Sequence, residues 1–89
     1  MIKQDITIIN KLGLHARAAA KLAATCKRFA SRIRVSGDDK QIDAKSVMSL
    51  MLLAAGQGTT LHFEFDGPDK EDALRQVEDL IADYFGEGE

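Results

Sequence analysis

The sequence has 89 residues, of which 45% are hydrophobic and 29% are charged, and this composition predicts a single globular domain spanning residues 1–89. Its 12 basic and 14 acidic residues give a formal net charge of −2, which disfavours a nucleic-acid-binding protein because such proteins carry basic surfaces. The single cysteine, Cys26, excludes an intrachain disulfide and indicates a cytoplasmic compartment, and the longest apolar run, residues 50–55, is too short for a membrane span.

The first third of the chain has the pattern of a strand, a turn and a helix. Residues 2–9 place Ile2, Ile6 and Ile8 on one side of an extended chain, which predicts a strand with one half-buried face. Residues 10–14 contain a glycine and predict a turn. Residues 16–30 predict an amphipathic helix, whose apolar positions recur at helical spacing: Ala19, Leu22, Ala23, Cys26, Phe29 and Ala30.

The next segment predicts a β-hairpin. Residues 31–36 alternate, with Ile33 and Val35 on one face of the strand and arginines on the other. A turn at Gly37-Asp38-Asp39 then leads to a short second strand over residues 41–44.

A short helix is predicted to follow the hairpin. Ser46 is a favourable N-cap residue, and the apolar stretch 47–55 comes directly after it. Gly56 and Gly58 should end this helix because glycine is the usual residue just beyond a helix C-terminus.

The last third predicts a strand and a long helix. Residues 60–66 alternate, so that Phe63 and Phe65 share a face with Leu61, and Gly67-Pro68 ends this strand. Asp69 is expected to cap the helix, with Asp72 in a weak capping-box position, and residues 86–89 are expected to fray. The apolar stripe of the helix comprises Ala73, Leu74, Val77, Leu80, Ile81, Tyr84 and Phe85.

The predicted order of elements is therefore β-α-β-β-α-β-α. Each strand has one apolar face and each helix has one apolar stripe, so the elements can be buried by packing in two layers. The fold class that follows is α+β, an open-faced sandwich in which a four-stranded antiparallel sheet is covered on one face by three helices.

His15 is the residue whose position best suits chemistry. It lies at or beside the N-cap of the first predicted helix, where the backbone N–H groups of Ala16 and Arg17 have no partner within the helix. These groups and the positive end of the helix dipole favour an anion, and the Arg17 guanidinium suits phosphate oxygens. Because neutral imidazole is a nucleophile, the pattern favours phosphate chemistry; the alternative is a histidine that only caps the helix beside a surface arginine.

Other kinds of site have little support in the sequence. His62 lies on the polar side of its strand and is expected to be solvated. Two histidines and one cysteine, scattered along the chain, do not predict a metal site. The glycine-rich motifs that bind nucleotide phosphates are also missing from the sequence, so we expect no cofactor.

Two longer stretches resemble a known family. NKLGLHARAAAKLA resembles the phosphohistidine motif of HPr, the histidine-containing phosphocarrier of the bacterial phosphoenolpyruvate-dependent phosphotransferase system, and DAKSVMSLMLLAAGQGTTLHFEFDGPDKEDAL resembles that family's second motif with its last strand, turn and helix. The resemblance implies that His15 accepts a phosphoryl group on its δ nitrogen from phospho-enzyme I and passes it to a histidine of an EIIA-type protein, with Arg17 stabilising the group in transfer. It also implies an open-faced sandwich.

The resemblance also bears on regulation and on the rigidity of the site. Ser46 lies where regulated members carry a serine that an ATP-dependent HPr kinase phosphorylates, although capping alone would explain a serine there, and both roles stay open. The family usually has proline directly after the His-x-Arg triplet, and this chain has Ala18. Alanine continues the helix but fixes its first turn less firmly than proline does, and the exchange suggests a specialised member.

The placement of charge suggests where partners dock. From Lys11 to Arg34 the chain has seven basic residues and no acidic one. We expect a monomer that meets an acidic rim around an apolar centre on its partners. The predicted docking residues are Lys21 and Lys27 of the first helix with Val47, Met48 and Leu50 of the short helix.

Two further classes of function compete with a phosphocarrier. A regulatory protein that acts only by docking would not need His15. RNA-recognition domains share the element order β-α-β-β-α-β, but they need aromatic residues on the open face of the sheet. Here Phe63 and Phe65 are expected to face the helices.

Overall fold

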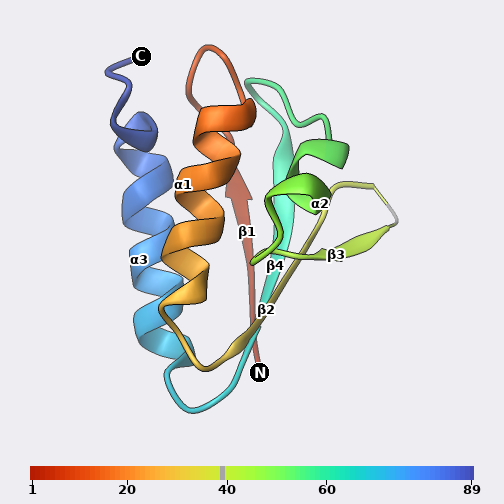
Figure 1. Ribbon diagram of the computed structural model, residues 1–89, viewed down its shortest axis with the longest axis vertical. Coiled ribbons are helices and arrows are strands. Elements are labelled where there is room, and N and C mark those ends of the chain that lie inside the picture. The colour runs from red at the N-terminus through yellow and green to blue at the C-terminus, as the bar shows by residue number, and fades with distance from the viewer. Residues whose placement is uncertain (39) are drawn as a thin grey trace.

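The computed structural model describes residues 1–38 and 40–89, and within them the chain forms four strands, three α-helices and one 3-10 turn (Figure 1). The strands form one antiparallel sheet in the order β1-β4-β2-β3, and the helices lie together on one face of it. This arrangement confirms the predicted open-faced sandwich. The elements are β1 (Ile2–Thr7), α1 (Ala16–Lys27), β2 (Arg32–Ser36), β3 (Gln41–Asp43), α2 (Val47–Leu52), β4 (Thr60–Asp66), α3 (Lys70–Ala82) and η1 (Tyr84–Gly86).

The core lies between the sheet and the helices. Strand β4 is central, pairing with β1 on one side and β2 on the other, and its Phe63 and Phe65 side chains are 1% and 0% exposed. Ile33 and Val35 of β2 pair with these two phenylalanines and are also buried. The prediction that Phe63 and Phe65 face the helices is confirmed, so the aromatic residues of β4 are not on the open face as RNA recognition requires.

The inner face of α1 consists largely of small side chains. Ala18, Ala19, Ala23 and Cys26 on its inner face are all buried. Burial raises the pKa of the Cys26 thiol to about 12, and the nearby positive charge of Lys45 opposes this rise only in part. Because the thiolate is the reactive form, Cys26 is an inert core residue.

The helix predicted over residues 16–30 ends earlier, at Lys27, because of a contact with a distant residue that the spacing of apolar residues cannot predict. The backbone N–H groups of Ala30 and Ser31 each donate to the Asp69 carboxylate at 2.9 Å, which draws the chain away from the helix axis. The Ser31 hydroxyl also donates to Asp69. The side chain of Asp69 therefore makes no capping bond to α3, and the predicted capping box is wrong, since Asp72 pairs with Arg75 instead.

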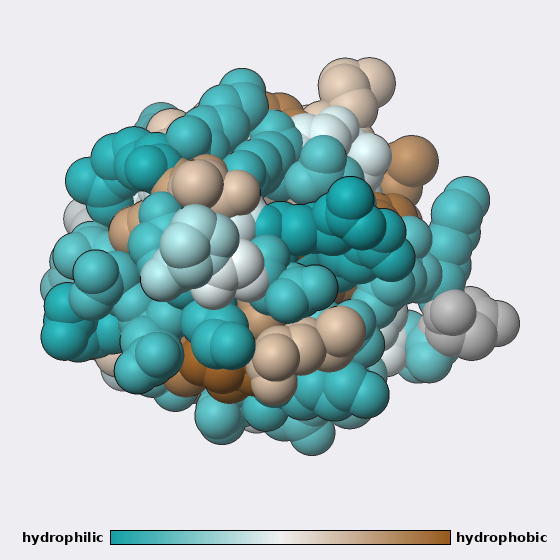
Figure 2. All heavy atoms as spheres, turned by 90° about the horizontal axis from the view of Figure 1, so that it is seen from below, coloured by the Kyte–Doolittle hydropathy of each residue, from teal (hydrophilic) through white to brown (hydrophobic). Residues whose placement is uncertain are grey.

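The hairpin and the ends of the molecule complete the architecture. Strands β2 and β3 pair antiparallel as predicted, and Asp39 of the predicted Gly37-Asp38-Asp39 turn lies outside the described residues. Figure 2 shows the end of the molecule that carries the turn between β4 and α3, where hydrophilic residues dominate and apolar ones form small separate patches. None of the helices in the described ranges combines the length and apolar character needed to cross a membrane.

The Asp69 contacts predict a change in acid stability. Hydrogen bonds from Ser31 and Ala30 hold the pKa of Asp69 below its ordinary value of 3.8, so its contribution to stability is present above that pH and is lost as the pH falls through the lower folded-state pKa. We expect Asp69→Asn to lower the free energy of unfolding near pH 7, and we expect this difference from the parent to shrink by about pH 3. Urea titrations at the two pH values, with Asp79→Asn as an exposed control, measure it; a constant difference would contradict this account.

Candidate functional site

His15 is the N-cap residue of α1 and has an extended backbone, with φ −74° and ψ 178°. Its carbonyl accepts the first helical bond from Ala19 at 2.8 Å, but its side chain does not cap the helix. The exposed Ala16 and Arg17 follow as the first helical residues, whose N–H groups cannot find a partner within the helix. The imidazole is thus free for other contacts at the positive end of α1.

The loop before His15 is fixed at both ends by backbone hydrogen bonds. The N–H of Ile8 donates to Thr59 at 2.8 Å, and the N–H of Leu14 donates to Ala55 at 2.8 Å. Gly13 has φ +70°, and a Cβ atom there would lie 2.6 Å from the carbonyl oxygen of Ala55. Only glycine fits this left-handed, closely packed position without displacing backbone.

The segment that follows α3 turns back over this loop. Tyr84 and Phe85 both have positive φ values near 55°, and Phe85 is buried. The Lys21 ammonium donates to the carbonyl oxygen of Phe85 at 2.7 Å. The N–H of Lys11 donates to the backbone oxygen of Glu89 at 3.0 Å. The predicted fraying of residues 86–89 is therefore wrong, because an apolar anchor and polar contacts hold the segment.

Glu87 brings a carboxylate to His15. Its Oε2 atom hydrogen-bonds with Nε2 of His15, and its Oε1 atom accepts from Nδ2 of Asn10 at 3.0 Å. The His15 and Glu87 side chains are 27% and 10% exposed. Burial opposes ionisation of Glu87, but hydrogen bonds from Asn10 and His15 and the charges of His15 and Arg17 outweigh it and hold its pKa below the ordinary value. Sequence patterns missed Glu87, since nothing local links it to a residue so distant in the chain.

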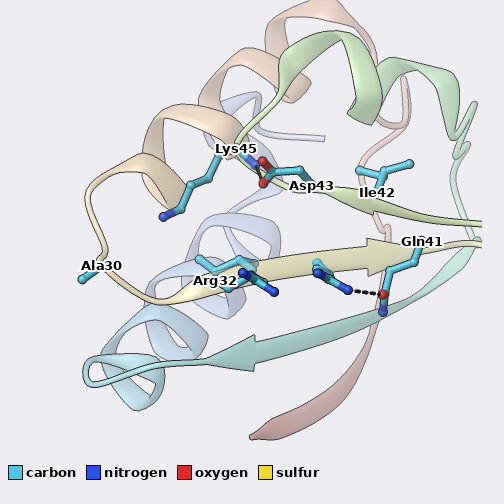
Figure 3. A pocket seen from close by; sticks show the side chains of 8 residues that line it. Ala30, Arg32, Gln41, Ile42, Asp43 and Lys45 are labelled. Atoms are coloured by element: carbon cyan, nitrogen blue, oxygen red, sulfur yellow. Dashed lines mark hydrogen bonds between the residues drawn. The ribbon is translucent and has the colours of Figure 1, made fainter.

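Two hollows can be compared as sites for a ligand. One, of about 450 Å³, lies at His15 and is lined by Leu12, His15, Arg17, Lys21, Gly86, Glu87 and Glu89. The other, of about 520 Å³, lies beside the β2–β3 hairpin (Figure 3). Its Arg34 guanidinium donates to Gln41 at 3.1 Å, and its Lys45 ammonium donates to Phe29 at 2.8 Å. Among the residues that the structure describes, none that lines the hairpin hollow has an imidazole or thiol, so nucleophilic chemistry belongs to the hollow at His15.

The residues predicted around α2 divide into exposed and buried ones. Ser46 is the N-cap residue, and its hydroxyl accepts from the N–H of Ser49 at 3.2 Å, which confirms the predicted cap. Met48 is 75% exposed and Val47 is half-buried. Leu50 is fully buried, so its prediction as a docking residue is wrong: it lies on the inner side of α2, in the core.

The exposed apolar residues near the site differ from those predicted for the docking surface. Lys21 and Lys27 of α1 are exposed, as a docking role requires. Alternation and helical spacing did not single out three exposed apolar side chains, Leu12, Met51 and Leu52. On the open face of the sheet, His62 is exposed as predicted and its Nδ1 atom pairs with Asp5 at 2.7 Å.

Comparisons with known proteins agree with one another. The family model described as "PTS HPr component phosphorylation site" matches residues 2–83. The chain belongs to the HPr family. It is 53% identical to the phosphocarrier protein HPr of Cupriavidus necator and 52% identical to that of Neisseria meningitidis serogroup A, each over 89 residues and the full length of both chains.

Solved HPr structures show the same fold. A crystal structure of HPr from Thermoanaerobacter tengcongensis has a TM-score of 0.94 and 42% identity, with 98% of each chain covered. The Bacillus subtilis protein Crh, described as a swapped dimer, has a TM-score of 0.70 and 36% identity, with 98% of this chain and 95% of that one covered. Membership of the HPr family makes this chain a phosphocarrier protein of the phosphotransferase system.

The position of Gly13 generates a prediction for this HPr-family chain. Gly13→Ala places a side chain against the Ala55 carbonyl at a strained φ, so we expect a loss of about 1–3 kcal/mol in the free energy of unfolding. Gly56→Ala is the matched control, since a Cβ there meets nothing within 4 Å, and it should stay within about 1 kcal/mol of the parent. Urea unfolding measures the free energy of unfolding of both variants. Equal values for the two would contradict this account, because they would show that the loop accommodates a side chain at residue 13 without loss of stability.

Proposed function

We propose that this chain accepts a phosphoryl group on Nδ1 of His15 from phospho-enzyme I and passes it to a histidine of an EIIA-type protein. The observation that carries the proposal is the imidazole at the positive end of α1, with one nitrogen engaged by Glu87 and the exposed Arg17 two residues on. Family membership supports the two partners, because HPr proteins act within the phosphotransferase system.

The chemistry needs a nucleophile and a means of stabilising the transferred group. The lone pair of Nδ1 forms the new N–P bond while the bond between phosphorus and the donor nitrogen breaks and its electron pair stays with the donor. The free N–H groups of Ala16 and Arg17 face an anion favourably, and the Arg17 guanidinium can bind two phosphoryl oxygens at once. No metal or other cofactor enters this step.

Partner docking is proposed for the surface formed by α1 and α2, which pack against each other. Met48 and Leu52 are four residues apart on α2 and 75% and 77% exposed, so they present one apolar face. Lys21 and Lys27 lie on the neighbouring α1. Exposed apolar side chains beside cations suit a partner with an acidic rim around an apolar centre.

Two further proposals concern the compartment and the oligomeric state. We infer a cytoplasmic site of action from the single buried thiol, which suits a reducing compartment. The monomeric state stays a prediction.

His15 is tested by phosphorylation with enzyme I and phosphoenolpyruvate. The parent should gain one acid-labile, base-stable phosphate, and His15→Ala should gain none because it lacks the nucleophile. His62→Ala, which removes the other imidazole of the sequence, is the matched control and should accept phosphate like the parent. Arg17→Lys keeps the charge but loses the planar fork, so its transfer should be slower at unchanged stability. Phosphate on His15→Ala would refute the proposal.

Ser46 is proposed as a site where phosphorylation by an HPr kinase slows transfer. Its hydroxyl already accepts a bond from Ser49, and a phosphate or carboxylate there can keep an acceptor at the same place. The added negative charge would lie next to Val47 and the exposed Met48 of the proposed docking surface. It would therefore repel an acidic partner and hinder apolar contact.

Ser46→Asp and Ser46→Ala separate the two roles of this residue. Ser46→Asp should keep the melting temperature equal or slightly higher and should slow phosphorylation of His15 by enzyme I. Ser46→Ala should lose the cap, at a cost of about 0.5–2 kcal/mol, and should leave the transfer rate unchanged. Thermal melting and initial transfer rates at fixed salt measure both. If Ser46→Asp transferred at the parent rate, the serine would be only a cap.

A further inference from the structure

The carboxylate of Glu87 is held in a fixed orientation by its neighbours. Nδ2 of the buried Asn10 donates to Oε1 of Glu87 at 3.0 Å and to the carbonyl of Gly13 at 2.8 Å. Both neighbours are acceptors, so only the amide nitrogen of Asn10 can face them. Its buried Oδ1 atom has no hydrogen-bond partner among the described residues, which shows that this side chain is oriented by its donor end alone. One Glu87 oxygen is thereby fixed, and the other is presented to His15.

The segment that carries Glu87 is also anchored on both sides of it. Phe85 is buried and its carbonyl accepts from Lys21 at 2.7 Å, while the carbonyl of Glu89 accepts from the N–H of Lys11 at 3.0 Å. Glu87 thus comes to His15 on a backbone that is tied down two residues before and two residues after it. Such support is typical of a group whose placement is part of a site.

A carboxylate at Nε2 decides which nitrogen of the neutral imidazole carries the proton. The pKa of Glu87 lies below its ordinary value, so near neutral pH the side chain is ionised and can only accept hydrogen bonds. The ring must then donate through Nε2–H, and in neutral imidazole this leaves the lone pair on Nδ1. Nδ1 itself has no hydrogen-bond partner within the described part of the chain.

From this geometry we infer that Glu87 is a positioning residue for His15: it holds the Nε2–H tautomer and the ring orientation that turn the Nδ1 lone pair toward the incoming phosphoryl group. The inference rests on the proposed function and adds to it the residue that selects the reacting nitrogen. The family resemblance implies only which nitrogen reacts, whereas Glu87 gives a physical reason for it in this chain.

The charge balance of the transfer fits this role. As Nδ1 forms its bond to phosphorus and the donor nitrogen leaves with its electron pair, the imidazole ring gains a positive charge and keeps its Nε2 proton. The Glu87 carboxylate on that proton compensates the new charge. When the phosphoryl group moves on, the electron pair of the N–P bond returns to Nδ1 and the ring is neutral again. No proton needs to enter or leave the site in either direction.

The opposite reading of the same contact is a cover that blocks His15. A cover would have to be displaced before transfer, so weakening the contact would speed phosphorylation. A positioning residue has the reverse effect, because the ring loses its fixed tautomer and its charge partner. The two readings therefore predict rate changes of opposite sign for the same substitution.

Three variants separate these readings. Glu87→Gln keeps the shape but can donate as well as accept, so it no longer requires Nε2–H. Glu78→Gln is the matched control with the same change in charge, because Glu78 is exposed on α3 and is not among the described residues that line the hollow at His15. Glu87→Asp keeps the carboxylate on a shorter side chain and should retain part of the effect.

The first measurement is nitrogen NMR of the His15 ring in the unphosphorylated chain. In the parent and in Glu78→Gln we expect a protonated Nε2 whose proton is slow to exchange with water, and an unprotonated Nδ1. In Glu87→Gln this proton should exchange fast and the two nitrogen shifts should move toward a mixture of tautomers. A parent ring that is protonated on Nδ1, or a Glu87→Gln ring identical to that of the parent, would overturn the inference.

The second measurement is the initial rate of phosphorylation by enzyme I over a range of chain concentrations. We expect Glu87→Gln to lower kcat by on the order of tenfold with little change in KM, by analogy with the hydrogen-bond partners that orient metal-bound imidazoles, whose loss has effects of this size. Glu87→Asp should be intermediate, and Glu78→Gln should match the parent. Faster phosphorylation of Glu87→Gln than of the parent would identify a cover instead.

The two measurements also distinguish this inference from the proposed function. Loss of the Nε2–H signature in Glu87→Gln together with phosphorylation of His15→Ala would mean that the positioning contact exists but that His15 is not the acceptor. Phosphorylation confined to His15, with no change in signature or rate in Glu87→Gln, would leave the proposed function standing and refute the role of Glu87.

Discussion

Backbone pairing between Ile8 and the segment before β4 is the constraint on which the site depends. The N–H of Ile8 donates to Thr59 at 2.8 Å and its carbonyl accepts from Gly58 at 2.7 Å. The two segments of the chain therefore stay hydrogen-bonded to each other beyond the end of the β1–β4 ladder. Leu14 then closes the other end of the loop on Ala55. Because both ends of the loop are fixed, His15 is held at the N-cap position of α1. The same loop places Asn10 where its side chain donates to Glu87 in the segment that follows α3.

The layers of the fold could be predicted because the signals that encode them are local. Alternation marks β4 at its observed bounds, and it assigns Phe63 and Phe65 to the buried face because neighbouring side chains of a strand point to opposite sides. The same holds for His15 and Ser46, which precede helices at positions where the free N–H groups of a first turn must find partners. In these cases a few adjacent residues contain the whole physical cause.

Two of the features that sequence patterns missed depend on partners far away in the chain. Helix α1 ends early because the N–H groups of Ala30 and Ser31 donate to the Asp69 carboxylate, some forty residues later, and so do not extend the helix. The prediction of Leu50 as a docking residue fails because the stretch 47–55 is apolar at every position except Ser49, so spacing alone does not show which side is buried. Glu87 lies 72 residues from His15 in the sequence. Its approach to His15 depends on the left-handed turn at Tyr84 and Phe85, and neither tyrosine nor phenylalanine predicts a left-handed backbone.

The separation of 72 residues between His15 and Glu87 also orders the events by which the protein comes into being. A ribosome releases His15 long before Glu87, and the β1–β4 pairing that joins Ile2 to Phe65 cannot form until most of the chain is available. Contacts between such distant residues form late, because a long loop must be closed before they stabilise the chain. A nascent or partly folded chain thus carries an imidazole without its carboxylate partner, and under the proposed role of Glu87 such a chain would exchange phosphoryl groups more slowly than the folded protein does.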